Sequence, residues 1–425
     1  MVEKKSIKAK GHSNTGDRTS GKARPPGLVM PDEPLPLVFR IGLILIFGLL
    51  FIFTLKEVSS LDVGFHLRTG NYILEGNGWP RTDPFSYTFP HHVYIDSQWG
   101  YQVILALMEK IGGSAALIFF HSSLVLVCFY LLYRTARLMP IDPVTLLLLF
   151  FLSAAAAEFR FMARPELMSW VFLASVLYIL HRYTEGRNPP LWLLPIILLI
   201  WVNCHNGFVL GWMAVGCFFV GLSIKQRRFD KRIFKWGSAS VLVTVINPYH
   251  IHGVLFPFTL ISSFRSGSLF GQAISELVSP FASGGQTTVQ LPFYPYTILV
   301  PYFILFAASL VAAVCLFRKQ KYWAVLLFLP FLYLSAKMMR SIPLLVVACL
   351  PVMIYGLPLD HVGRLFRWGD RRYRRFTLVA ALVLMLLTIG MASYVVTDAY
   401  YLSTRRVDRF GWDWNRTALP VEAMN

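Results

Sequence analysis

The chain has 425 residues, of which 56% are hydrophobic and 15% charged, and its mean hydropathy is +0.55. This composition excludes an ordinary water-soluble globule and predicts an all-α, polytopic membrane protein. The net charge of +18 would suit a nucleic-acid-binding protein, but the basic residues form short clusters between apolar runs, where they set membrane orientation, so we expect no nucleic-acid partner.

Residues 1–34 differ from everything that follows them. They are polar, basic and rich in Pro and Gly, which predicts a disordered cytoplasmic tail and not a cleaved signal peptide. A membrane-crossing helix needs about 20 predominantly apolar residues. By this measure we expect about 11 transmembrane helices, at 35–55, 113–133, 142–158, 165–181, 189–203, 207–224, 233–247, 296–317, 322–336, 341–357 and 376–396.

The basic clusters orient these helices. With the N-terminus inside, every large cluster falls in an interior segment, as the positive-inside rule requires. Residues 35–397 then form one transmembrane domain, and 398–425 an exterior C-terminal segment that reads as the start of a further domain. In the first exterior loop, 56–112, the segment 98–110 is too short to cross a bilayer and is followed by Gly112 and Gly113, so we expect interfacial helices there.

Polar residues gather at the exterior ends of the predicted helices. The first loop contains LDVGFHLRTG and IDSQWG, and later segments read EFRFMARPE, NCHNG, NPYHIHG and KMMRS. Charged groups at membrane depth are costly and usually face a cavity or a partner. These clusters therefore predict a polar chamber at the exterior membrane surface.

Several motifs together carry a resemblance to a known family. In chain order they are DVGFHLRTG, DPFSYT, IDSQWG, ARPELMSW, WVNCHNGFVLG, NPYH and RSIPLL, between Asp62 and about Pro343. They resemble an uncharacterised family of bacterial multi-span membrane proteins with the motifs D-x-W-W-H-L-x-x-G, D-P-F-S-x-T and E-W-L. That family resembles, more distantly, the GT-C superfamily of glycosyltransferases that use polyprenyl-phosphate sugars.

The resemblance implies a GT-C-like fold in the bacterial inner (cytoplasmic) membrane, with a cytoplasmic N-terminus and a periplasmic C-terminus. It implies no cofactor, a polyprenyl-phosphate sugar as donor substrate, contact with membrane lipid, and a glycan, lipid or protein acceptor. Asp62 stands shortly after the first span and is the expected general base, since sugar transfer to a hydroxyl requires proton removal. The alternative is that Asp62 caps a helix beginning at Val63.

His66 lies four residues after Asp62 and would share its helix face, where it would orient the carboxylate or bind substrate; packing at the interface is the alternative. The substrate-binding residues that we expect are Asp96, Gln98, Trp99, Arg160, Arg164, Asn203, His205, His250 and Arg340. The arginines suit a phosphate because the guanidinium is a planar, permanently charged fork. Alternatively they pair with Glu158 or Glu166, or reach lipid headgroups.

Three further points qualify this site. Gln98 replaces the glutamate of the family's E-W-L, so a carboxylate is missing there. Asn203, His205 and Asn206 would hydrogen-bond sugar hydroxyls or cap helix ends. His250 and His252 have no acidic residue near them in sequence, and we expect no metal.

Three other functions fit the same residues. A transporter of lipid-linked glycans would also bury polar groups, but it should have gating residues on both membrane faces. A ligase would move a whole glycan from its lipid diphosphate. A non-catalytic envelope-assembly protein would explain the aromatic first loop.

Overall fold

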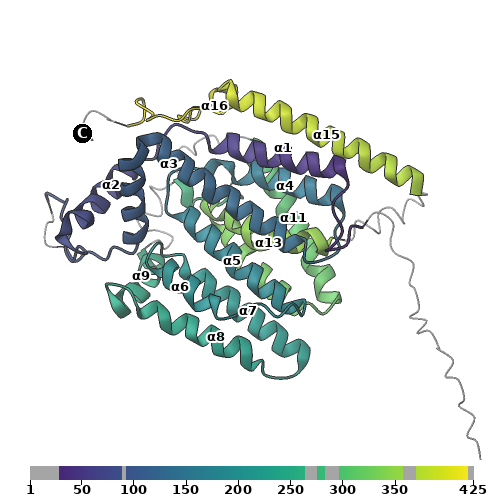
Figure 1. Ribbon diagram of the computed structural model, residues 1–425, viewed down its shortest axis with the longest axis horizontal. Coiled ribbons are helices and arrows are strands. Elements are labelled where there is room, and N and C mark those ends of the chain that lie inside the picture. The colour runs from purple at the N-terminus through teal and green to yellow at the C-terminus, as the bar shows by residue number, and fades with distance from the viewer. Residues whose placement is uncertain (1–27, 89–91, 264–274, 283–295, 358–369, 420–425) are drawn as a thin grey trace, which may run out of the picture.

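The computed structural model describes residues 28–419 except 89–91, 264–274, 283–295 and 358–369. Every regular element among them is helical (Figure 1). The longer helices are α1 (Leu37–Thr54), α2 (Val63–Tyr72), α3 (Trp99–Ala136), α4 (Pro143–Ala157), α5 (Glu166–Thr184), α6 (Leu193–Val202), α7 (Phe208–Gln226), α8 (Lys231–Leu242), α9 (His250–Ser263), α11 (Tyr296–Arg318), α12 (Tyr322–Lys337), α13 (Ile342–Gly356) and α15 (Asp370–Val396). The short ones are α16 (Ala399–Ser403), η1 (Ile73–Asn77), η2 (Glu158–Arg160), η3 (Val243–Val245), η4 (Ser275–Leu277) and η5 (Met339–Ser341).

Seven of these helices are long and apolar enough to cross a membrane: α1, α3, α4 with η2, α7, α11, η5 with α13, and α15. An eighth span results if α8 and α9, which meet at a bend, count as one, and α6 and α12 are shorter apolar helices. The prediction of a multi-pass α-helical membrane protein is therefore confirmed. Helices occupy all eleven predicted segments, but the total of eleven crossings remains a prediction.

Burial divides the bundle into central and peripheral helices. In the apolar windows of the spans Pro143–Arg160 and Met339–Gly356, 83% of the residues are buried, against 22% in Arg372–Val396. The first two spans therefore form the centre, and α15 lies at the edge beside α1 (Figure 1). The hydrophobic core of the bundle contains large buried side chains such as Phe129, Phe150 and Trp170.

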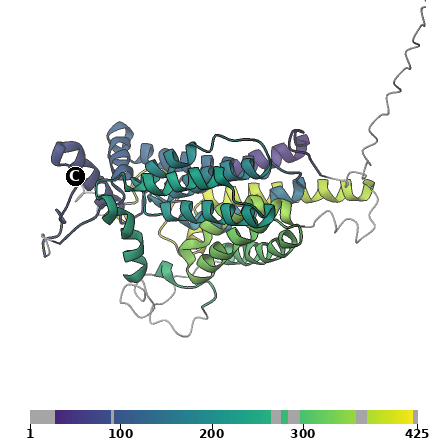
Figure 2. The same cartoon turned by 90° about the horizontal axis from the view of Figure 1, so that it is seen from below.

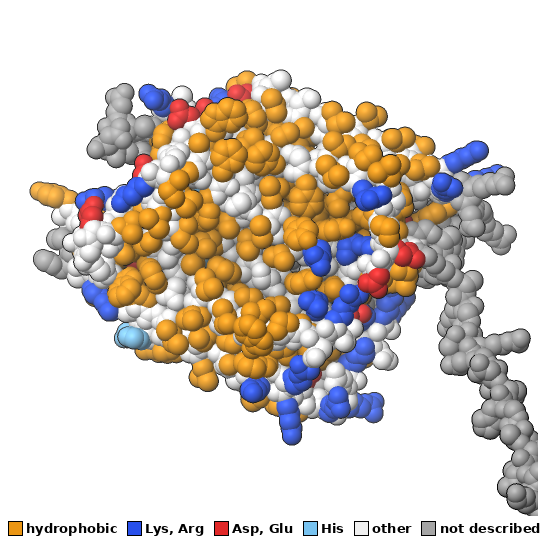
Figure 3. All heavy atoms as spheres, in the orientation of Figure 1, with side chains coloured by type: hydrophobic (Ala, Val, Ile, Leu, Met, Phe, Trp, Pro, Cys, Tyr) orange, Lys and Arg blue, Asp and Glu red, His pale blue; other side chains and the backbone are white. Residues whose placement is uncertain are grey.

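The two ends of the bundle differ in chemistry. At one end of the bundle, α5 contacts the start of α8 through Tyr183 and Asp230, and the start of α12 through Glu185 and Lys321. We call this end the basic end. Hydrophobic side chains cover the middle of the face in Figure 3, and Lys and Arg gather toward the turn between α7 and α8. The opposite end, which we call the site end, holds α2, α9 and the start of α3 (Figures 1 and 2).

The first loop and the C-terminal segment are joined at the site end. Lys56 pairs with Phe410 and Val58 with Trp414 in isolated β-bridges, so residues 398–419 lie against the start of the first loop. Helix α3 is broken at Gly112 and Gly113. Gly113 has a φ of 57° and a ψ of −145°, a backbone conformation that glycine adopts readily and residues with a side chain rarely do. The predicted separate helix over 98–110, ended by this glycine pair, is thus confirmed, and its place at the membrane interface remains a prediction.

Candidate functional site

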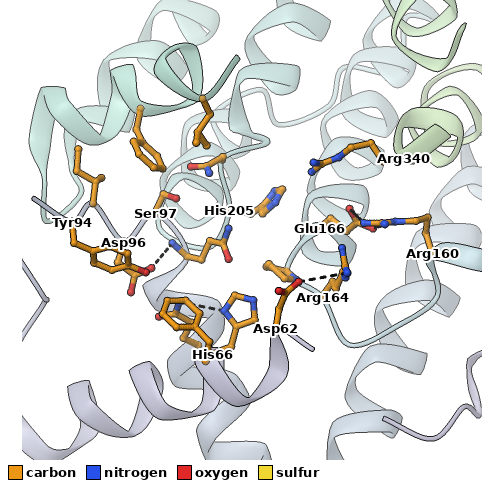
Figure 4. A pocket seen from close by; sticks show the side chains of 18 residues that line it. Asp62, His66, Tyr94, Asp96, Ser97, Arg160, Arg164, Glu166, His205 and Arg340 are labelled. Atoms are coloured by element: carbon orange, nitrogen blue, oxygen red, sulfur yellow. Dashed lines mark hydrogen bonds and ion pairs between the residues drawn. The ribbon is translucent and has the colours of Figure 1, made fainter. Parts of the chain in front are cut away.

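A cavity of about 390 Å³ opens at the site end, where the first loop, the turn before α5, the turn between α6 and α7, and α9 meet (Figure 4). Eight of the eleven predicted site residues line it: Asp62, His66, Asp96, Gln98, Arg160, Arg164, His205 and Arg340. The folded chain therefore has a polar cavity where the predicted residues meet, and its place at the exterior membrane surface remains a prediction. Its further lining residues are Phe65, Tyr94, Ile95, Ser97, Gln102, Pro165, Glu166, Asn206, Phe256 and Leu260.

Asp62 stands at the mouth of this cavity, immediately before α2. Its side chain is 56% exposed, and Oδ2 lies 3.5 Å from Nη2 of Arg164. Although Asp62 occupies the position before the first helical residue, its side chain makes no capping hydrogen bond to α2. The alternative role as a helix cap is therefore not what this carboxylate does; it pairs with Arg164 and remains accessible at the mouth of the cavity.

A chain of ion pairs crosses the wall of the cavity behind Asp62. Arg160 is almost completely buried and forms a bidentate pair with Glu166 at 2.6 and 2.7 Å. Its third nitrogen, Nη1, lies 2.6 Å from Glu276, which also approaches Arg164 at 3.3 Å. All three guanidinium nitrogens of Arg160 thus contact a carboxylate. Of the two predicted roles for this arginine, pairing with Glu166 is the one observed, and no nitrogen is left to bind a phosphate.

Arg340 is the contrasting arginine. It lies in η5, lines the cavity and is half-buried, and within the described part of the chain no carboxylate lies within ion-pair distance of it. Figure 4 shows its guanidinium directed toward His205 and the cavity. An arginine without a carboxylate partner that faces a partly enclosed cavity has the charge and the donor groups to bind an anion.

His205 presents a hydrogen-bond donor to the same cavity. The indole N–H of Trp201 donates to Ser169 Oγ at 2.7 Å, and this hydroxyl donates to His205 Nδ1 at 2.6 Å. The backbone N–H of Gly207 also donates to Nδ1, at 3.1 Å. Because Nδ1 accepts these bonds, the proton of the neutral ring resides on Nε2. Burial lowers the pKa of His205 to about 4, so the ring is neutral at pH 7.

His66 is a second neutral imidazole. Burial lowers its pKa to about 4, and Nδ1 lies 3.3 Å from the amide nitrogen of Gln102. Asp62 is held by Arg164 and not by this ring. His66 therefore does not orient Asp62, which was one of its two predicted roles. It does line the cavity, as the other predicted role, substrate binding, requires.

Asp96 is a buried acid in the cavity and differs from Asp62 in its surroundings. It is 2% exposed, its Oδ1 accepts the backbone N–H of Gln98 at 3.1 Å, and its Oδ2 has no hydrogen-bond partner in the described chain. Burial raises its pKa to about 7. Two of the three carboxyl groups that line the cavity, Asp62 and Asp96, thus have opposite environments, one exposed and one buried.

The raised pKa of Asp96 makes a prediction about stability. Ionising it in the folded protein is unfavourable, so the folded state loses stability as pH rises from about 4, near the ordinary pKa of 3.8, to about 7. Asp96→Asn should unfold at a higher temperature than wild type at about pH 8 and at the same temperature at about pH 4. The gain is at most a few kcal/mol, because one pKa unit corresponds to about 1.4 kcal/mol. Equal stabilisation at both pH values would contradict the raised pKa.

Four buried polar atoms in this cavity have no hydrogen-bond partner in the described chain. They are Asp96 Oδ2, Gln102 Oε1, Arg164 Nε and Asn206 Oδ1. Buried polar groups are almost always paired in folded proteins, and exceptions collect where a ligand binds. Three oxygen atoms, from Asp96, Gln102 and Asn206, and one arginine N–H donor suit a ligand with both hydroxyl and anionic groups.

Three predicted site residues do not line the cavity. Trp99 donates its indole N–H to Asn203 Oδ1 at 2.9 Å, and the Asn203 amide donates to the carbonyls of Leu199 and Ile246. This pair ties α3 to the ends of α6 and η3, so Asn203 has the structural role that was the alternative. His250 is exposed at the start of α9. Sequence reasoning placed these three by proximity to the motifs, which does not determine where a side chain points.

Other residues of the site were not foreseen. Glu276 pairs with the buried Arg160 and the half-buried Arg164, but it lies in a long segment between α9 and α11 with no recognisable motif. The aromatic rings of Phe65 and Tyr94, 6.3 Å apart between centroids, form an apolar surface in the cavity. The many aromatic residues of the first loop could have predicted an aromatic surface, but they do not indicate which of those residues form it.

Among the described residues, no group of three or more His, Cys, Asp or Glu side chains lies together as a metal site would require, and the expectation of no metal remains a prediction. The amino-acid sequence matches no protein-family model, and no curated protein matches it at a significant level.

Proposed function

We propose that this protein is an integral-membrane glycosyltransferase of GT-C-like architecture. In this proposal it crosses the bacterial inner membrane eleven times and takes a sugar from a polyprenyl-phosphate donor at the periplasmic face. The acceptor is a hydroxyl group of a glycan, lipid or protein. No cofactor is required, because the donor already carries an activated sugar.

The observation that carries the proposal is the content of one cavity. It brings together an exposed carboxylate, Asp62, an unpaired arginine, Arg340, and four buried polar atoms without partners, beside the aromatic rings of Phe65 and Tyr94. Sugar transfer needs a base, a cation for the departing phosphate, and polar and aromatic groups for the sugar. These requirements are met at one end of an apolar helical bundle, where a lipid donor would arrive.

The reaction follows from these positions. The acceptor oxygen forms a bond to the anomeric carbon of the sugar while the bond from that carbon to the phosphate oxygen breaks. The acceptor proton moves to the carboxylate of Asp62, and the electron pair of the broken bond leaves with the polyprenyl phosphate. Arg340 binds the charge that develops on the phosphate, and His205 donates a hydrogen bond from Nε2 to the sugar or phosphate.

Arg164 and Arg160 have supporting roles in this scheme. Arg164 lies 3.5 Å from Asp62 and positions the carboxylate at the mouth of the cavity. Arg160 is saturated by Glu166 and Glu276 and fixes the wall that carries Arg164. The three arginines are therefore not equivalent, although their sequence contexts look alike.

The proposal is tested by incubating purified protein in nanodiscs with radiolabelled polyprenyl-phosphate sugars and envelope extracts as acceptors. Transfer of label to an acceptor, or its release to water, establishes the activity and identifies the donor. Complete absence of turnover with a folded protein and every donor would contradict the proposal. It would favour a lipid-linked glycan transporter, a ligase that uses a lipid diphosphate, or an assembly protein.

Arg340→Gln tests the anion site. The variant should raise the KM for the lipid-linked donor roughly ten- to a hundredfold, since charged hydrogen bonds contribute about 1.5–3 kcal/mol. The matched control is Lys337→Gln, which removes an exposed cation three residues away whose contact within the described chain is with Tyr333. A KM that changes equally in both variants would show that general surface charge, and not Arg340, attracts the donor.

A further inference from the structure

The motif NPYHIHG is conspicuous in the sequence but has no part in the chemistry above. In the structure it forms the corner between α8 with η3 and α9, and the two helices meet at 98°. Figures 1 and 2 show α8 parallel to the bundle while α9 runs across its site end. If the bundle crosses the membrane, α9 lies in the plane of the membrane surface.

This corner is rigid. The side chain of Asn247 accepts the N–H of Tyr249 at 2.9 Å and donates to the carbonyls of Thr244 and His250, both at 2.9 Å. Gly253 packs against Asn247 so closely that a β-carbon there would lie 2.3 Å from Oδ1. The direction of α9 is therefore set by buried hydrogen bonds and not by loop flexibility.

The corner is also attached to the first loop. The hydroxyl of Tyr249 donates to the carbonyl of Pro80 at 2.8 Å, and the guanidinium of Arg81 lies 5.2 Å from the centre of its ring. Helix α9 thus keeps a defined position relative to the cavity, one wall of which the first loop forms.

The two faces of α9 have different surroundings. One face carries Ile251, Leu255, Phe258 and Ile261, which are all exposed, by between 48% and 66%. Phe256 and Leu260 are half-buried and line the cavity. At 100° per residue the first set and the second set point to opposite sides of the helix. Helix α9 is therefore an apolar partition with the cavity on one side.

We propose that α9 is an in-plane membrane helix that forms the lipid-side wall of the cavity. Its outer stripe, Ile251, Leu255, Phe258 and Ile261, contacts acyl chains of the bilayer. Its inner residues, Phe256 and Leu260, pack on the hydrocarbon chain of a lipid phosphate whose headgroup reaches Arg340. The second part rests on the proposed function for the class of ligand, and the first part does not.

Charge and polarity support this occupant. A lipid phosphate needs a cation and an apolar surface together, and Arg340 with Phe256 and Leu260 supplies both in one cavity. The exposed stripe continues the apolar exterior of the bundle, since Leu242 and Ile246 just before the corner are also exposed. The continuous apolar surface indicates that the outer partner is the bilayer itself.

The inner face is tested by the binding of sugar-free isoprenyl monophosphates of increasing chain length. Wild type should bind long chains more tightly than short ones, and Phe256→Gln with Leu260→Gln should reduce this preference roughly tenfold. Phe256→Leu with Leu260→Phe, which keeps the surface apolar, should retain it. Arg340→Gln should weaken all chain lengths alike. An unchanged chain-length preference in the double Gln variant would overturn the assignment of the inner face.

These measurements separate the two proposals. Chain-length-dependent binding without sugar transfer would support the role of α9 as the lipid-side wall and refute the glycosyltransferase activity. Sugar transfer by wild type with no dependence of binding on chain length would support the glycosyltransferase activity and refute the role of α9 as the lipid-side wall.

The outer face is tested by photo-crosslinking in nanodiscs that contain radiolabelled acyl lipid. A photoreactive residue in place of Phe258 should capture lipid, and one in place of Tyr87, an almost fully exposed residue of the first loop, should capture much less. Equal or weaker labelling at position 258 would show that α9 does not contact the bilayer.

Discussion

Asp62→Asn should abolish sugar transfer while leaving the amount of folded protein unchanged. The substitution keeps the shape of the side chain but removes the only group in the proposed reaction that accepts the proton of the acceptor hydroxyl. General-base catalysis contributes roughly 10²- to 10⁴-fold to rate, so kcat should fall by at least this factor. The KM for the donor should change little, because Arg340 and the polar atoms of the cavity remain.

Stability should be unaffected by the same substitution. Asp62 is 56% exposed and its contact with Arg164 is 3.5 Å long, and exposed ion pairs contribute at most about 1 kcal/mol. The matched control is Asp83→Asn in the same loop. Asp83 accepts the backbone N–H groups of Phe85 and Ser86 through Oδ1, which asparagine also supplies. Full transfer activity in Asp62→Asn would refute the proposed base, and an equal loss in Asp83→Asn would indicate a defect of the loop as a whole.

Glu158→Ala should produce the largest loss of stability. Glu158 is completely buried, and its two oxygens lie 2.5 Å from Lys56 and 2.7 Å from Arg406. The hydroxyl of Tyr400 donates to the same carboxylate at 2.9 Å. Removing the carboxylate leaves two cations close together with one remaining acid, Asp408, which pairs with Arg406 at 2.5 Å. Breaking a buried pair in this way costs about 3–5 kcal/mol.

The effect should be visible locally as well as globally. Lys56, Glu158 and Arg406 belong to the first loop, the end of α4 and the C-terminal segment, so the variant should release residues 398–419 from the bundle. We expect a lower unfolding temperature in detergent and faster proteolysis within 398–419. Glu75→Ala is the control, since it breaks the exposed pair with Arg68 at 3.4 Å and should change neither quantity. Wild-type stability of Glu158→Ala would show that this network does not hold the two segments together.

Local patterns were sufficient to predict part of this protein. The apolar segments and the distribution of Lys and Arg predicted a multi-pass helical membrane protein, because the bilayer imposes both length and composition on each helix. The polar clusters at one end predicted a shared chamber, and eight of the eleven named residues line it. Asp62, Arg164, His205 and Arg340 were found this way because charged and polar groups beside a membrane have few other places to go.

Only the tertiary structure distinguished among residues that look alike in sequence. Arg160 and Arg340 both stand at helix ends on the same side of the bundle, yet Arg160 is saturated by Glu166 and Glu276 while Arg340 has no carboxylate partner within the described chain. Glu276 is 112 residues from its other partner, Arg164, and no local pattern encodes a contact over that separation.

The same holds for the surroundings of the acids and for the corner at Asn247. Asp62 and Asp96 share a loop, but packing exposes one and buries the other, and burial alone raises the pKa of Asp96 to about 7. NPYHIHG, which contains the expected substrate-binding residue His250, forms a corner held by the side chain of Asn247, whose hydrogen bonds go to backbone groups. The sequence by itself determined the membrane class, the positions of the helices and the polar end, through local composition. The tertiary structure decided which charges are free, which are paired and where α9 points, since these depend on contacts between distant segments.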